Sequence, residues 1–87
     1  MNKRKLYNRI KVLREERGMS RQELADEIGV NMQTVGYLER MDYTPSLDLA
    51  FRICEIFGLP VEMVFSTKKL QSLSQVLQER SQGKENQ

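Results

Sequence analysis

Signals that start and stop α-helices recur at short intervals along this chain, and they constrain its fold more than any other feature. Ser20 is followed three residues later by Glu23, the capping-box pattern in which each side chain bonds the other residue's backbone N–H. Gly29 can end that helix in the left-handed conformation, and Asn31 can cap a new one. The pattern therefore predicts two short helices joined by a turn of three residues, 29–31.

Apolar side chains recur on one face of each of these two helices. The residue before each cap, Met19 or Val30, can also close a hydrophobic staple with Leu24 or Val35 in the first turn of the helix that follows. The two faces should therefore pack on a common core. The stripes are Leu24, Ala25 and Ile28 on the first helix, and Val35 and Leu38 on the second.

Similar signals predict three further helices, within residues 6–18, 46–58 and 60–65. The first and the second of these end at a glycine, and the third follows a proline. The chain is therefore expected to be an all-α domain of five helices. Its remaining core candidates at helical spacing are Leu6, Ile10, Leu13, Leu49, Ala50, Ile53, Cys54, Phe57, Val61, Val64 and Phe65.

The composition excludes most chemistries that a small protein could perform. The 87 residues suffice for one small domain, and they include no His and a single Cys. An imidazole base, an internal disulfide and a His or Cys-pair zinc site are therefore excluded, and we expect neither an enzyme nor a metal or other cofactor. Cys54 lies in an apolar stripe, which favours a buried small hydrophobe over a sensing thiol.

Charge and hydropathy bear on location and partners. Polar and charged residues such as Asn8 and Arg9 follow the basic start where a signal peptide needs an apolar core, and no apolar run is long enough to span a membrane. A cytoplasmic protein without membrane contact is expected. The net charge of +2 conceals a basic stretch over 1–19 and an acidic one over 20–65. Any contact with nucleic acid must therefore be argued from particular residues.

Two short helices across a tight, glycine-containing turn are typical of a helix-turn-helix, whose second helix can enter the major groove of DNA. An ordinary helical hairpin is the alternative. The side of the second helix opposite its apolar stripe carries Gln33, Gly36, Tyr37 and Arg40, where a merely solvated face would favour Glu, Lys and Ala. A Gln can pair with adenine and a Tyr can pack on a thymine methyl, so this face suits base reading.

The first turns of the two helices are poor in negative charge. Met32, Gln33 and Thr34 are all uncharged, and Arg21 is a cation at a helix N-terminus, where the helix dipole disfavours it. Both features make sense if phosphates approach there, because helix N-terminal amides bind anions. Neutral surface choices are the alternative, since the energies involved are small.

Six segments of the chain form one combined pattern: Ile10-Lys11-Val12-Leu13-Arg14-Glu15-Glu16-Arg17-Gly18, Ser20-Arg21-Gln22-Glu23-Leu24-Ala25, Ile28-Gly29-Val30, Gln33-Thr34-Val35, Leu38-Glu39 and Pro45-Ser46-Leu47-Asp48-Leu49-Ala50. Taken together, these segments resemble the Cro and phage-repressor type of helix-turn-helix, also called Xre-like. The resemblance spans about residues 6–65 and implies a five-helix, lambda-repressor-like domain that binds operator DNA as a dimer and regulates transcription.

The resemblance also implies roles for single residues. Gln33 takes the main base-reading position, and one ion pair ties the first helix to the third. The residues concerned are Met32, Gln33, Thr34 and Tyr37 for bases, Arg21, Arg40, Tyr43 and Thr44 for phosphates, and Arg14 with Glu39 for the ion pair. Two positions depart from the family pattern: Met41 stands where Gly is usual, and Asp42 where a basic residue is common. These departures put the end of the third helix and the affinity for phosphate in question.

Three regions are predicted: a DNA-binding domain over 5–65, an amphipathic helix over 66–80 carrying Leu70, Leu73 and Leu77, and a solvated tail over 81–87. The extra helix either contacts a second copy or packs on its own domain.

The predicted function is a sequence-specific regulator, acting as a repressor, that binds a palindromic double-stranded operator as a homodimer without a small-molecule ligand. The alternatives are an antitoxin-like module that also binds a protein, and a domain that binds only protein.

Overall fold

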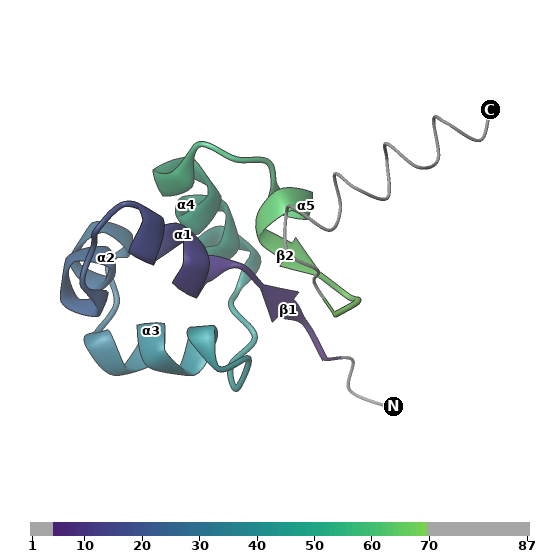
Figure 1. Ribbon diagram of the computed structural model, residues 1–87. Coiled ribbons are helices and arrows are strands. Elements are labelled where there is room, and N and C mark those ends of the chain that lie inside the picture. Colours follow the sequence, from purple (N-terminus) through teal and green to yellow (C-terminus); the bar gives the residue numbers. More distant parts are fainter. Residues whose placement is uncertain (1–4, 70–87) are drawn as a thin grey trace.

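Both helices of the predicted helix-turn-helix are present in the computed structural model, which describes residues 5–69. Helix α2 spans Arg21–Ile28 and α3 spans Met32–Glu39 (Figure 1). The capping box forms as predicted, since Ser20 Oγ accepts from the Glu23 N–H and Glu23 Oε1 accepts from the Ser20 N–H, both at 3.0 Å. Gly29 is left-handed with φ 76°. Asn31 Oδ1 accepts from the Thr34 N–H at 2.9 Å and so caps α3.

The three other predicted helices frame this pair. Helix α1 spans Ile10–Glu16, α4 spans Leu47–Phe57 and α5 spans Val61–Val64. Ser46 caps α4, and Gly58 ends it with φ 65°. The Arg17 guanidinium donates to the carbonyls of Ile56 and Phe57 at 2.8 and 2.9 Å, which fastens the end of α1 to the end of α4.

The apolar stripes meet in one core. Met19 and Val30 pack against it together with the fully buried Leu24 and Val35, as the two staples predict. With its inner side in this core, α3 lies along the lower edge of the molecule in Figure 1, apart from α4 and α5. The buried apolar residues are Ile10, Leu24, Ala25, Ile28, Val35, Leu38, Leu49, Ala50, Ile53, Cys54, Phe57 and Val64.

The five predicted helices are all present, and two short strands that the sequence did not predict are added to them. Strand β1, Tyr7–Asn8, pairs antiparallel with β2, Phe65–Ser66, with Tyr7 opposite Ser66 (Figure 1). Helix α1 begins only at Ile10, and α5 ends before Phe65. The prediction that Leu6 and Phe65 are helical is therefore wrong. Helical spacing at these positions was misleading because backbone pairing between distant segments decides their conformation.

Asn8 joins the small sheet to the helix-turn-helix. Its Nδ2 donates to the Leu38 carbonyl at 2.8 Å, near the end of α3, and its Oδ1 accepts from the Ile10 N–H at 3.0 Å. The side chain thus satisfies a backbone donor at the start of α1 and a backbone acceptor in α3. The sequence indicated no role for this residue.

Several predicted features lie outside residues 5–69. They include the apolar stripe of the expected helix over 66–80 and the tail over 81–87, although Ser66 itself belongs to β2. Among the helices of residues 5–69, none combines the length and apolar character that crossing a bilayer demands. The same stretch contains no group of three or more Cys, Asp or Glu side chains placed to hold a metal ion.

Candidate nucleic-acid interface

The outer face of α3 is open to solvent while its inner face is buried. Val35 and Leu38 are fully buried, whereas Gln33 is exposed and Met32 and Tyr37 keep 44% and 50% of their surface accessible. An aromatic ring and a thioether therefore project beside an amide. Met32, Gln33 and Tyr37 thus lie on the outer face of α3, as helical spacing predicts.

A shallow hollow of about 230 Å³ lies on this face, lined by Arg21, Met32, Gln33, Gly36, Tyr37 and Arg40. The first residue of α2 thus shares one surface with α3. Gly36 was expected to be exposed, and that expectation is wrong: it is buried because the Arg40 side chain lies over it. Its lack of a side chain makes room for another side chain.

The predicted ion pair between Arg14 and Glu39 is present and buried. Arg14 Nε donates to Glu39 Oε2 at 2.6 Å, and Arg14 NH1 donates to the Met19 carbonyl at 2.7 Å. The Glu39 side chain is 1% exposed. The pair therefore holds α1, the start of α2 and the end of α3 in one arrangement.

Arg21 is a third member of this ion-pair network that the sequence reasoning missed. Its Nε donates to Glu39 Oε1 at 2.9 Å, while 45% of its side chain remains exposed. The helix dipole disfavours a cation in the first turn of a helix, which was the signal in the sequence; it was interpreted as a sign of an approaching phosphate, and the structure places the Glu39 carboxylate beside Arg21. Burial opposes ionisation of Glu39, but the hydrogen bonds and charges of Arg14 and Arg21 outweigh it, so the pKa of Glu39 is lowered.

Arg40 lies back along α3 instead of extending away from it. Its guanidinium carbon is 5.1 Å from the centre of the Tyr37 ring, and its Nε is 3.4 Å from Asp42 Oδ2. The chain turns after Arg40 because Met41 adopts a left-handed conformation with φ 60°. The N–H groups of Met41 and Asp42 then donate to the carbonyls of Leu38 and Tyr37, so the helix ends as it does with glycine at that position.

The remaining predicted contacts differ in how accessible they are. Tyr43 and Thr44 are exposed in the loop that follows Met41, with 45% of Tyr43 accessible. Thr34 is only half-buried at the start of α3, and its hydroxyl donates to Asn31 Oδ1 at 2.9 Å. Its hydrogen is thus engaged in the helix cap, which leaves a lone pair and the methyl group for other contacts.

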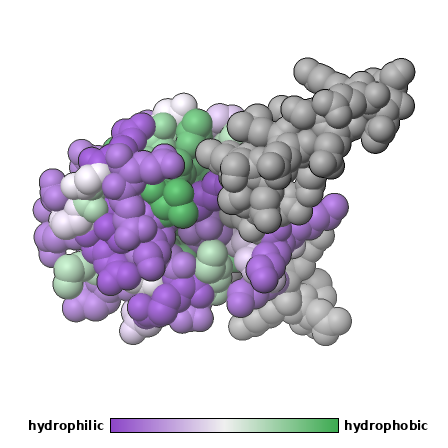
Figure 2. Space-filling model, in the orientation of Figure 1, coloured by the Kyte–Doolittle hydropathy of each residue, from purple (hydrophilic) through white to green (hydrophobic). Residues whose placement is uncertain are grey.

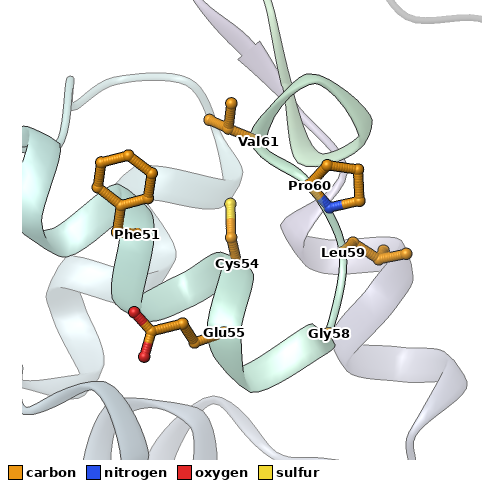
Figure 3. A pocket seen from close by; sticks show the side chains of 7 residues that line it. All are labelled: Phe51, Cys54, Glu55, Gly58, Leu59, Pro60 and Val61. Carbon is orange, nitrogen blue, oxygen red and sulfur yellow. The ribbon is translucent and has the colours of Figure 1, made fainter.

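A second, apolar hollow of about 260 Å³ lies between α4 and α5 and shares no residue with the hollow on α3. Figure 3 shows the Cys54 side chain pointing between Phe51 and Val61. Cys54 is only 5% exposed, which confirms the prediction of a buried cysteine. Burial, then the nearby charges of Glu62 and Glu55, raise the pKa of its thiol. The face shown in Figure 2 is largely hydrophilic, and its main hydrophobic area lies over the part where Figure 1 draws α4.

Two capped helices across a three-residue turn, with the outer face of the second one open, define this molecule as a helix-turn-helix protein. The sequence pattern of the helix-turn-helix family HTH_3 matches residues 10–64. The chain belongs to this Xre/Cro-like family, as its motifs indicated.

Curated relatives carry the same description. An uncharacterized HTH-type transcriptional regulator of Bacillus subtilis, YgzD, is 45% identical over 60 residues, which cover 69% of this chain and 91% of the relative. An uncharacterized HTH-type transcriptional regulator of Methanocaldococcus jannaschii, MJ0272, is 38% identical over 60 residues, with coverage of 69% and 91%. These matches cover most of the relatives' own length.

Solved structures share the fold. A putative DNA-binding protein from Bacteroides fragilis superposes with a TM-score of 0.63 at 24% identity, covering 70% of this chain and 98% of that one. A transcriptional regulator from Listeria innocua gives 0.60 at 21% identity, covering 85% of this chain and 71% of that one. At these identities the likeness concerns the fold alone.

Proposed function

We propose that this protein binds double-stranded DNA in a sequence-specific manner and regulates transcription by occupying an operator, as a repressor. The observation that carries the proposal is the outer face of α3, where Gln33 and Tyr37 project while Val35 and Leu38 hold the helix on the core. A helix mounted in this way can enter the major groove without unpacking the domain. Its relatives are named as regulators, which agrees with this reading.

In the proposed complex, base edges and phosphates are contacted by different residues. Gln33 pairs with adenine N6 and N7, and Tyr37 packs against a thymine methyl, with Met32 and Thr34 beside them. Arg21, Tyr43 and Thr44 approach phosphates along the rim of the groove. The ion pair between Arg21 and Glu39 orients the guanidinium and weakens its pull on a phosphate, so the backbone contribution is modest.

A homodimer on a palindromic operator completes the proposal. One chain supplies one recognition helix, and a short helix reads only a few base pairs. Two copies related by a two-fold axis would place their α3 helices in successive major grooves about 34 Å apart. The predicted amphipathic stretch over 66–80 remains a proposed contact between the copies.

Selection of bound sequences from a random DNA pool tests the function directly. We expect an enriched palindrome, and Gln33→Ala should bind it about 5- to 150-fold more weakly while binding to random DNA and thermal unfolding change little. Gln22→Ala is a matched control, because Gln22 bonds Asp26 on α2 and does not line the hollow. Failure to bind any DNA at low salt would overturn the proposal and favour a domain that binds only protein.

A further inference from the structure

The position of Arg40 is the least expected feature of the α3 surface. A side chain at the end of a recognition helix would be expected to extend toward the phosphates at the rim of the groove. Here the guanidinium bends back toward the start of the helix, over Gly36 and Tyr37, and lines the same hollow as Gln33. The positive charge therefore lies at the hollow that Gln33 also lines, on the surface proposed to face the bases.

Tyr37 and Gly36 define the place of the guanidinium on the surface of α3. The Tyr37 ring lies 5.1 Å from it, close enough for a favourable cation–π contact. A β-carbon added at Gly36 would lie 3.3 Å from Arg40 Nη1, so an alanine at this position would displace the guanidinium by a few tenths of an ångström. A glycine inside a helix is less favourable than an alanine, and here it lets the Arg40 guanidinium lie close against the helix.

Asp42 is the third residue that restrains the Arg40 guanidinium. Its carboxylate lies 3.4 Å from Arg40 Nε, and its place is set by the left-handed Met41 and by the bond from the Asp42 N–H to the Tyr37 carbonyl at 2.9 Å. A carboxylate beside Nε offsets the charge that would attract a phosphate. It leaves terminal N–H donors of the guanidinium for another acceptor.

We propose that Arg40 reads a guanine in the operator, held in place for this by Tyr37, Gly36 and Asp42. This inference rests on the proposed DNA-binding function and replaces the phosphate contact that the family resemblance implied for Arg40. A guanidinium can donate two parallel bonds to guanine O6 and N7, which no other base offers. Asp42 is a positioning residue that disfavours phosphate and fixes the donor geometry.

The inference also places the guanine relative to the adenine read by Gln33. Gly36, over which the guanidinium lies, is three residues beyond Gln33, a rise of about 4.5 Å along the helix. Successive bases on one strand are about 3.4 Å apart. The guanine should therefore occur within about two base pairs of the adenine in each half-site.

The test uses the full chain and the sequence selected by the wild-type protein. Each guanine is replaced in turn by 7-deazaguanine, which lacks the N7 acceptor but leaves every phosphate unchanged. We expect one position per half-site where this lowers wild-type affinity about 5- to 150-fold. Arg40→Lys keeps the charge but cannot form the paired bonds, so it should bind weakly and be insensitive to 7-deazaguanine there.

Asp42→Asn and the salt dependence provide the second readout. Without the carboxylate the guanidinium can turn toward phosphates, so Asp42→Asn should bind random DNA more tightly and discriminate less against 7-deazaguanine. Arg40→Ala should leave the slope of log K against log salt nearly unchanged if Arg40 contacts a base. Thermal unfolding of each variant identifies any loss that comes from misfolding.

Two other results would separate a failure of the inference about Arg40 from a failure of the proposed DNA-binding function. If Arg40→Ala weakens binding to all sequences equally and reduces the salt slope by about two, one for each copy in the dimer, Arg40 contacts a phosphate and this inference fails while the proposed function stands. If the wild-type protein selects no sequence at all, the proposed function itself fails.

Discussion

Replacement of Glu39 by Gln should destabilise this protein more than almost any other change that conserves side-chain size. Glu39 accepts from Arg14 Nε at 2.6 Å, from Arg14 NH2 at 3.5 Å and from Arg21 Nε at 2.9 Å, and the Arg14 side chain is itself only 11% exposed. A hydrogen bond to a charged group contributes about 1.5–3 kcal/mol. Glu39→Gln leaves Arg14 buried without a counter-charge, for which a loss of about 3–5 kcal/mol is expected.

This loss is comparable with the whole stability of a small domain. At about 0.05–0.15 kcal/mol per residue, a chain of 87 residues has a free energy of unfolding of roughly 4–13 kcal/mol. Urea unfolding followed by circular dichroism should therefore show a midpoint lowered by about 1–5 M, or no folded baseline. Glu27→Gln is the control, because Glu27 is exposed on α2, and its effect should stay within about 0.5 kcal/mol.

A double variant separates the loss of the ion pair from the cost of an unpaired charge. Arg14→Met with Glu39→Leu removes both buried charges and fills the space with apolar groups, which is often neutral or stabilising. We expect the double variant to be clearly more stable than Glu39→Gln alone. A loss below about 1 kcal/mol for Glu39→Gln, or a double variant no more stable than that single one, would refute this reasoning.

Three further predictions concern pH, the end of α3 and salt. Burial opposes ionisation of Glu39, but its arginine partners outweigh burial and lower its pKa. Ionised Glu39 therefore makes its full contribution to the unfolding free energy above its pKa in the unfolded chain, near 4.3, and this contribution is lost as the pH falls through the lowered pKa of the folded protein. The difference in unfolding free energy between wild type and Glu39→Gln should thus narrow below about pH 4, and a constant difference from pH 7 to pH 2 would contradict this assignment. Met41→Gly should raise the unfolding free energy by about 0.5–1 kcal/mol and Tm by a few degrees, because glycine adopts the left-handed conformation of Met41 without strain; a lower Tm would show that the methionine side chain contributes more than its backbone costs. Of the two cations that line the α3 hollow, Arg21 is the one left for a phosphate when Arg40 contacts a base, so the log–log salt slope of a dimer on its operator should be about −2; a slope near −10 would mean that other basic residues face the DNA.

The sequence by itself determined the helices and their order. Ser20, Asn31 and Ser46 each cap a helix as predicted, and Gly29 and Gly58 are left-handed where a helix had to end. These signals are local, since a cap or a stop acts through backbone groups within four residues. The buried pair of Arg14 and Glu39 was also predicted, but from the family resemblance and not from spacing alone.

Only the tertiary structure decided how distant residues meet. The pairing of Tyr7 with Ser66, the bond of Arg21 to Glu39 and the burial of Gly36 beneath Arg40 each depend on the path of the backbone or on rotamers that no sequence period records. Phe65 fits a helical stripe as well as a strand, and its pairing with Asn8 in the small sheet decided between the two; Leu6 lies outside any element, just before that sheet. Local hydrogen bonding specifies where a helix starts and ends, whereas the direction in which a long polar side chain lies is set by whichever partners the folded chain brings within reach.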